Sequence, residues 1–155
     1  TEIGKLISQR LGYQLLDVDN IIEKEQNMTI TDIFKFYGEH RFRDIESDVI
    51  KRLSDTENAV ISTGGGAVIR EENINNLRKK GIIFCLTASP ETILKRTFNN
   101  NDRPLLQVEN PLQKIKELLS IRRPYYEKAD FMIDTENRSP IEIAEEVIMR
   151  FKNSA

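Results

Sequence analysis

The spacing of apolar residues along the chain predicts a series of helices. Close to the N-terminus, apolar residues recur at spacings of three and four, which places them on one helix face: Ile3, Leu6, Ile7 and Leu11. Gly12 is suited to end this first helix. Apolar spacing and capping residues predict further helices over residues 29–38, 40–53, 71–80, 90–98, 112–126 and 139–151.

Short apolar runs between these helices predict strands. They lie in "YQLLDVDN" (residues 13–20), "AVIS" (59–62), "IIFCLTA" (82–88) and "FMID" (131–134). The third run is continuously apolar, as expected of a parallel strand that is buried on both faces. Because strands alternate with helices, the sequence predicts an α/β fold with a mostly parallel sheet.

One long segment, "NNNDRPLLQVENP" (residues 99–111), shows no periodicity and is rich in Asn and Pro. An irregular connection of this length in a compact domain is usually a binding loop or a lid. We therefore expect a lid over about residues 98–111.

Candidate chemistry gathers where the first two strands end. Asp17 and Asp19 follow the first strand, and the triplet Gly64, Gly65 and Gly66 follows the second. Ligands of parallel α/β sheets bind at the carboxyl ends of the strands, so these residues are expected to share one crevice. Glycine loses more backbone entropy on folding than other residues, so the triplet indicates that something lies close to a bare backbone.

Composition and charge narrow the function classes. The 155 residues suit one domain, and a net charge of −2 argues against a general nucleic-acid or membrane binder. The single cysteine, Cys85, excludes a disulfide framework and favours a reducing compartment. No apolar stretch approaches the length of about 18 residues that spans a membrane. We expect a monomer in the cytoplasm.

Two interpretations of the acidic pair remain open. In the first, one of Asp17 and Asp19 caps the following helix and the other is solvated. In the second, one lies near a hard cation such as Mg²⁺ and the other accepts a proton from a substrate hydroxyl.

Arg43 and Glu46 are three residues apart on a predicted helix, so their side chains can meet. Such pairs commonly lie on the surface and contribute little. Arg43 follows the core-facing Phe42, however, which holds the guanidinium near the apolar body. A fixed guanidinium oriented by Glu46 is suited to binding a carboxylate with two hydrogen bonds.

Basic residues of the second half cluster near loops: Lys95, Arg96, Arg103, Arg122 and Arg123. Arg103 lies in the predicted lid, and Arg122 and Arg123 precede Pro124. Phosphoryl transfer depends mainly on positioning and on charge stabilisation, for which such mobile arginines are suited.

Taken together, the motifs resemble the shikimate kinase family over almost the whole chain. The segments "DVD", "FRDIE", "STGGGAV", "RPLL" and "RRPYYEKA" occur in the family's order and spacing. The resemblance implies a three-layer α/β/α fold like that of nucleoside-monophosphate kinases. It also implies transfer of the γ-phosphate of ATP to the 3-hydroxyl of shikimate, with Mg²⁺. Residues 1–155 would form one domain with a helical substrate-binding subdomain (about residues 20–56) and the lid.

The resemblance assigns roles on the shikimate side. Asp19 matches the aspartate that binds the substrate hydroxyls and acts as the catalytic base. Arg43 and Arg122 match the arginines that hold the substrate carboxylate, and Glu46 resembles the partner of Arg43. The backbone of Gly64, Gly65 and Gly66 would lie against shikimate.

It also assigns roles on the nucleotide side. Asp17 matches an aspartate close to Mg²⁺, and Arg103 resembles the lid arginine that reaches the phosphates. Arg96 and the "NRSP" stretch, which contains Arg138 and Pro140, resemble the surroundings of the adenine.

The chain departs from the family at its N-terminus. The family begins with a strand and a phosphate loop of the form G-x-x-x-x-G-K-[ST]. Here the first four residues align with the end of that motif, so Thr1 would be the Mg²⁺-binding hydroxyl residue. We expect the sequence to be truncated, because the family's first strand would lie in the middle of the sheet. Without it, two strand edges would be unpaired.

Two alternatives remain at this point. A related small-metabolite kinase such as a gluconate kinase fits less well, because Arg43 and Arg122 together favour a carboxylate substrate. A catalytically inactive relative that binds a ligand or partner protein is supported by the absence of the phosphate loop. The presence of the full set of Asp17, Asp19, Arg43, Arg103 and Arg122 argues against it, since an inactive copy has no chemical need for all of them.

Overall fold

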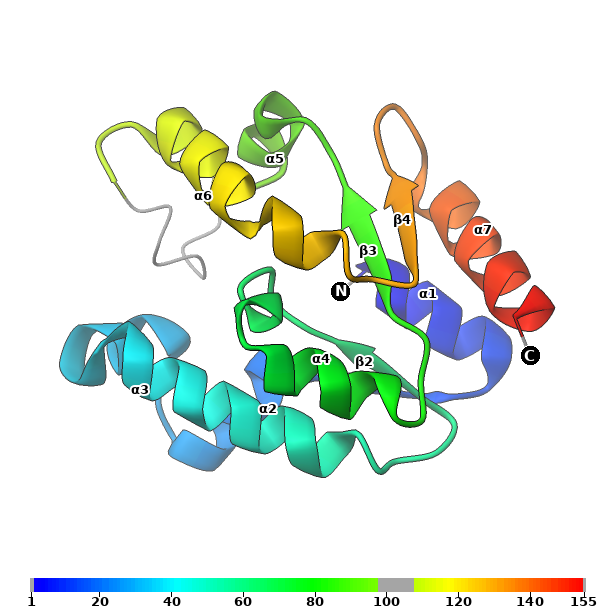
Figure 1. The fold of residues 1–155 in the computed structure, drawn as a ribbon, viewed down its shortest axis with the longest axis horizontal. Coiled ribbons are helices and arrows are strands. Elements are labelled where there is room, and N and C mark those ends of the chain that lie inside the picture. The colour runs from blue at the N-terminus through cyan, green and yellow to red at the C-terminus, as the bar shows by residue number, and fades with distance from the viewer. Residues whose placement is uncertain (1, 98–107, 155) are drawn as a thin grey trace.

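The computed structural model describes residues 2–97 and 108–154 and shows alternating helices and strands (Figure 1). The helices are α1 (Glu2–Leu11), α2 (Val18–Gln26), α3 (Ile30–Leu53), the 3-10 helix η1 (Ala67–Ile69), α4 (Glu71–Arg78), α5 (Pro90–Thr97), α6 (Pro111–Tyr126) and α7 (Pro140–Asn153). The strands are β1 (Gln14–Asp17), β2 (Ala59–Ser62), β3 (Phe84–Thr87) and β4 (Phe131–Asp134). The predicted α/β class is therefore confirmed.

All strand pairing in the described residues is parallel. β1 pairs with β2, and β3 pairs with β4, each in register along the four residues of the strand. The described strands form two separate two-stranded sheets and not one continuous sheet. Consequently β2 and β3 each present one edge that no described strand pairs with.

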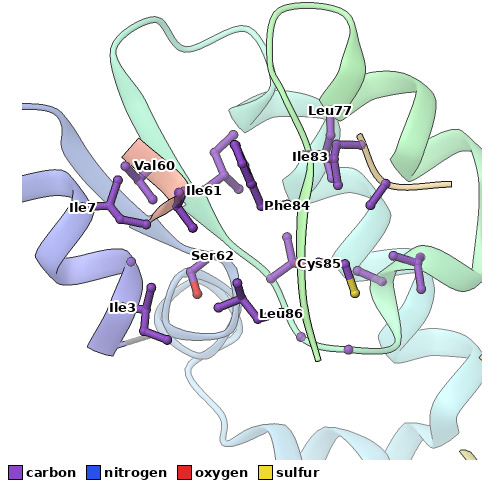
Figure 2. Close-up of a pocket in the computed structure, with 18 of the residues that line it drawn as sticks. Ile3, Ile7, Val60, Ile61, Ser62, Leu77, Ile83, Phe84, Cys85 and Leu86 are labelled. Carbon is purple, nitrogen blue, oxygen red and sulfur yellow. The ribbon is translucent and has the colours of Figure 1, made fainter. Parts of the chain in front are cut away.

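A cavity of about 1080 Å³ lies between these two edges (Figure 2). Ile3 and Ile7 of α1, Val60 of β2 and Leu86 of β3 are among the apolar side chains that line it. Leu86 remains 41% exposed, since no described element covers it. The prediction of a strand buried on both faces is thus wrong for β3.

Two apolar cores lie on opposite sides of the strands. Ile61 of β2 packs against a core from α2, α3 and η1, whose buried members are Val18, Ile22, Ile30, Ile33, Phe42, Ile45, Val49, Ile50 and Ala67. Val60, the preceding residue, packs against a core from α1, β4 and α7, whose buried members are Ile7, Ile133, Ile143, Ala144 and Val147. Successive residues of a strand point to opposite faces, so β2 contributes to both cores. Figure 1 shows α1 beside α7, with α2, α3 and α4 grouped away from them.

Helix α2 is the main element that the sequence analysis misses. The sequence pattern predicts that "VDN" belongs to the end of a strand, but the strand ends at Asp17. The Asp17 side chain accepts a hydrogen bond from the backbone N–H of Asn20 (3.2 Å) and so caps α2. Val18 and Ile22 are four residues apart in this helix, and both are fully buried.

The two helices predicted over residues 29–38 and 40–53 are joined into α3, with a kink at Gly38. Gly38 has φ 83° and ψ 169°, a backbone conformation that is almost restricted to glycine. The predicted break is therefore at the correct residue, although the chain resumes the helix directly after it. None of the helices in the described part of the chain has the length and apolarity needed to cross a membrane.

Replacement of Gly38 by alanine should destabilise the fold. Alanine at this φ and ψ costs about 1–3 kcal/mol, because its Cβ clashes with the backbone. Gly4→Ala is the matched control, since Gly4 lies inside α1 and an added Cβ meets Leu15 at an ordinary contact distance of 3.4 Å. Urea unfolding should show a loss of stability for Gly38→Ala and none for Gly4→Ala. Equal stability of the Gly38→Ala variant and the unsubstituted chain would contradict the prediction.

Candidate active site

The parallel pairing of β1 and β2 brings their carboxyl ends together, with Asp17 opposite Ser62. Beyond these ends, β1 continues into α2, and β2 continues into the turn formed by Gly64, Gly65 and Gly66, called here the glycine turn. Both carboxylate oxygens of Asp19 lie 3.9 Å from the position that a Cβ of Gly64 would occupy. The structure therefore brings Asp19 and the glycine turn into one crevice, as the strand order predicts.

Asp17 and Asp19 occupy different positions at the start of α2. Asp17 is the N-cap, which agrees with the interpretation that one member of the pair caps the following helix. Asp19 lies in the first turn of α2, where the helix dipole stabilises a negative charge. Both side chains are half-buried. Asp19 is thus the member of the pair that faces the glycine turn.

Arg43 and Glu46 form a buried ion pair, so the surface-pair interpretation is wrong. Arg43 Nη1 donates to Glu46 Oε1 at 2.8 Å, and the two residues are only 9% and 1% exposed. Arg43 Nη2 also lies 3.4 Å from a carboxylate oxygen of Glu39. The Arg43 guanidinium lies 5.1 Å from the centre of the Phe42 ring, which packs in the core. Glu46 and Phe42 together fix the orientation of Arg43.

Each glycine of the glycine turn faces a different polar group. An added Cβ at Gly66 would lie 2.2 Å from Arg43 Nη2, so only glycine leaves room for the guanidinium. A Cβ at Gly65 would lie 3.0 Å from the Tyr126 hydroxyl and 3.4 Å from Arg122 Nη1. At Gly64 the nearest groups are the carboxylates of Asp19 and Glu46. The triplet therefore allows charged side chains from α2, α3 and α6 to approach one short stretch of backbone.

Several buried polar atoms around the glycine turn have no hydrogen-bond partner in the part of the chain that the structure describes. They include Arg122 Nε, Arg43 Nε and Glu46 Oε2. Buried polar groups are nearly always satisfied in folded proteins, and exceptions often mark functional sites. Three unsatisfied atoms near one backbone turn indicate a built site for a polar ligand.

The electrostatics of the site centre on Glu46. Burial raises the pKa of the Glu46 carboxyl above its ordinary value, and the negative charge of Asp19 raises it further. The positive charges of Arg43 and, more weakly, Arg122 oppose this rise in the pKa. The site thus combines two guanidinium groups with two carboxylates, which suits an anionic ligand that also carries hydroxyl groups.

The predicted nucleotide-side arginines are engaged elsewhere in the fold. Arg96 donates to the hydroxyl (2.9 Å) and the carbonyl (3.1 Å) of Thr135, and it lines the same cavity as Arg122. Arg138 donates to the carbonyl of Asp134 (3.0 Å) and forms an ion pair with Glu146 (2.7 Å). Pro140 begins α7. No described contact brings Arg138 or Pro140 to the glycine turn.

Thr1, Arg103 and the lid residues 98–107 lie outside the described residues. Of the predicted metal ligands, the structure therefore describes Asp17. No group of three or more His, Cys, Asp or Glu that could hold a metal occurs within residues 2–97 and 108–154. Mg²⁺ is typically held by one or two carboxylates together with substrate phosphates and water, so the Asp17 carboxylate at the end of β1 suits this ion.

Tyr126 and Asn73 are site residues that the sequence analysis misses. The Tyr126 hydroxyl donates to the carbonyl of Gly65 at 2.9 Å. Asn73, which is fully buried, donates from Nδ2 to the carbonyl of Ala67 at 2.8 Å and so holds the residue that follows the glycine turn. The signal for Tyr126 is its spacing of four residues from Arg122 on the same helix.

The fold and the site define an α/β protein with a built site for a small anionic ligand. The family model described as "Shikimate kinase" matches residues 1–152. The chain is 51% identical to a shikimate kinase of Thermodesulfovibrio yellowstonii and covers 88% of that protein with 98% of its own length. It is 49% identical to a shikimate kinase of Caldicellulosiruptor saccharolyticus, with 96% of this chain and 86% of the relative covered.

A solved structure agrees with these sequence comparisons. The shikimate kinase from Acinetobacter baumannii in complex with shikimate matches with a TM-score of 0.94 at 36% identity, over 98% of this chain and 86% of that one. The chain belongs to the shikimate kinase family of ATP-dependent phosphotransferases. The alternative of a gluconate kinase therefore has no support.

The raised pKa of Glu46 predicts a pH-dependent difference in stability between the unsubstituted chain and Glu46→Gln. Because the folded-state pKa lies above the ordinary value of 4.5, ionised Glu46 is disfavoured in the fold. Its contribution to the unfolding free energy is therefore fully present below that value and is lost as pH rises through the raised pKa.

Urea unfolding of both proteins between about pH 4 and about pH 8 measures this difference. The stability of the unsubstituted chain relative to Glu46→Gln should fall with rising pH. Glu117→Gln, at an exposed position of α6, controls for the loss of one carboxylate. A relative stability that rises with pH would show that the ion pair with Arg43 outweighs burial.

Proposed function

We propose that the chain transfers the γ-phosphate of ATP to the 3-hydroxyl of shikimate, giving shikimate 3-phosphate and ADP. The observation that carries the proposal is the meeting of Arg43, Arg122 and Asp19 at one glycine turn, in a chain of the shikimate kinase family. Two guanidinium groups suit the shikimate carboxylate, and a carboxylate beside the turn suits its hydroxyls.

Arg43 and Arg122 hold the substrate carboxylate in this proposal. They approach the glycine turn from different helices, α3 and α6, so a carboxylate between them can accept hydrogen bonds from two sides. Glu46 keeps Arg43 in place. The carboxylate oxygens of the ligand would accept hydrogen bonds from the two arginines, whose Nε atoms have no partner among the described residues. Carboxylate binding therefore offers a hydrogen-bond acceptor to these buried nitrogen atoms.

Asp19 is the general base in this proposal. It accepts the proton of the 3-hydroxyl while that oxygen bonds to the γ-phosphorus, and the bond from phosphorus to the β–γ bridging oxygen breaks, which releases ADP. Because Asp19 flanks Gly64, the ring must lie along the glycine turn for its hydroxyl to reach the carboxylate. The bare backbone allows this approach, and the N–H groups of Gly65 and Gly66 are available to the ring hydroxyls.

The nucleotide side of the proposal rests on the family resemblance. Asp17 and Thr1 would hold Mg²⁺, which neutralises charge on the phosphates when bound. Arg103 would contact the phosphates. Arg96 would lie near the adenine together with Arg138 and Pro140.

The proposal extends to domain organisation. Helices on both sides of parallel strands support the three-layer α/β/α arrangement of nucleoside-monophosphate kinases, and α2 and α3 support a substrate-binding subdomain over about residues 20–56. The proposed lid, over about residues 98–111, lies largely outside the described residues. The expectation of a monomer in the cytoplasm remains part of the proposal; the location rests on the cysteine content.

Titration calorimetry without nucleotide, with shikimate and with its uncharged methyl ester, tests whether Arg122 binds the substrate carboxylate. Loss of a hydrogen bond to a charged group weakens binding about 10-fold to 100-fold, so Arg122→Ala should lose this much affinity for shikimate. It should lose little affinity for the ester. Arg123→Ala, at the exposed neighbouring position, is the matched control. Equal losses for both ligands would place Arg122 away from the carboxylate.

Shikimate-dependent release of ADP, with Mg²⁺ and ATP, tests the chemical step. Asp19→Asn should lower turnover by about two to four orders of magnitude, because the amide cannot accept the proton. Shikimate binding measured by calorimetry should change far less. Unchanged turnover would remove Asp19 from the mechanism.

A further inference from the structure

One hydrogen bond joins the end of α6 to the glycine turn. The Tyr126 hydroxyl donates to the carbonyl of Gly65 at 2.9 Å, although the two residues are 61 positions apart in the sequence. We propose that Tyr126 is a positioning residue that sets Arg122 against the glycine turn. The inference rests on the proposed role of Arg122 in binding the substrate carboxylate.

Arg122 and Tyr126 lie on the same face of α6, since residues four apart are neighbours on a helix. Both side chains converge on Gly65, where an added Cβ would lie 3.4 Å from Arg122 Nη1 and 3.0 Å from the Tyr126 hydroxyl. The hydrogen bond to the carbonyl of Gly65 therefore fixes the position of the last turn of α6 relative to the glycine turn. Because Arg122 is one helical turn before Tyr126, its position is fixed as well.

Arg122 depends on this anchor more than Arg43 does. Glu46 and Glu39 both form ion pairs with the Arg43 guanidinium, whereas no carboxylate of the described residues forms an ion pair with Arg122. The Nε atoms of both arginines are without a partner among the described residues. The last turn of α6 also contains Pro124, which lacks a backbone N–H and so removes one helical hydrogen bond. The last turn of α6 is therefore weakened, and no described carboxylate holds its arginine. The hydrogen bond from Tyr126 to Gly65 supplies the contact that keeps this turn in position.

The same hydrogen bond orients the backbone of the glycine turn. In a planar trans peptide the carbonyl and the following N–H point in opposite directions. Because the Gly65 carbonyl points to Tyr126, the N–H of Gly66 points away from α6. Tyr126 thus fixes both a guanidinium and a backbone donor, without touching the reacting atoms.

Tyr126→Phe tests the inference, because it keeps the ring and removes the hydroxyl. When binding needs a conformation that is only partly populated, the apparent affinity falls by the fraction that is competent. One neutral hydrogen bond shifts such an equilibrium about threefold to tenfold, so shikimate should bind more weakly by about this factor. Tyr125→Phe removes the adjacent hydroxyl, which makes no hydrogen bond that the structure shows, and is the matched control.

The methyl ester of shikimate separates positioning from a general structural defect. It lacks the charge that Arg122 meets, so Tyr126→Phe should weaken its binding much less than that of shikimate. Equal weakening for the two ligands, or none for shikimate, overturns the inference. Failure of the unsubstituted chain to bind shikimate would instead contradict the proposed function, so the two failures are distinguishable.

A second variant, Gly65→Ala, gives an independent measure. In the unsubstituted background the added Cβ would lie 3.0 Å from the Tyr126 hydroxyl, which is tight enough to push that oxygen off its hydrogen bond to Gly65, so shikimate binding should weaken. In the Tyr126→Phe background that oxygen is absent, and the added Cβ should therefore weaken binding less. Contacting residues show such non-additive effects in double-mutant cycles. Additive losses would show that Tyr126 and Gly65 act separately and would overturn the inference.

Discussion

The buried ion pair between Arg43 and Glu46 is the interaction on which the site depends. A buried charge is costly unless it is paired, so each member needs the other to remain in the fold. The pair in turn requires Gly66, because any larger residue would occupy the place of the guanidinium. A constraint on one side chain of α3 thus explains why the loop after β2 has a bare backbone.

The pair also leaves the site incompletely satisfied. One oxygen of Glu46 and the Nε atoms of Arg43 and Arg122 have no partner among residues 2–97 and 108–154, although each is buried. Natural proteins rarely bury such atoms without a reason, and a ligand that carries a carboxylate and hydroxyl groups would supply the missing partners. The fold therefore holds a region of unmet polar interactions that a ligand can complete.

The sequence predicts most of the elements because their signals are local. Capping by Ser139 and the non-helical backbone at Gly38 depend on neighbouring residues and are found where predicted. Helix α2 is missed because a short apolar run followed by acids fits a strand end equally well. The contact between Tyr126 and Gly65 joins residues far apart in the sequence, and no local pattern reports which hydroxyl meets which carbonyl. The exposure of Leu86 likewise depends on which elements cover β3.

The two arginines reach the glycine turn from different surroundings. Arg43 lies on α3, which packs in the core that contains Phe42, whereas Arg122 lies on α6, which packs against α5 and η1. A carboxylate held by both arginines would act as a non-covalent cross-link between α3 and α6. Ligand binding would then couple the local opening of one helix to that of the other.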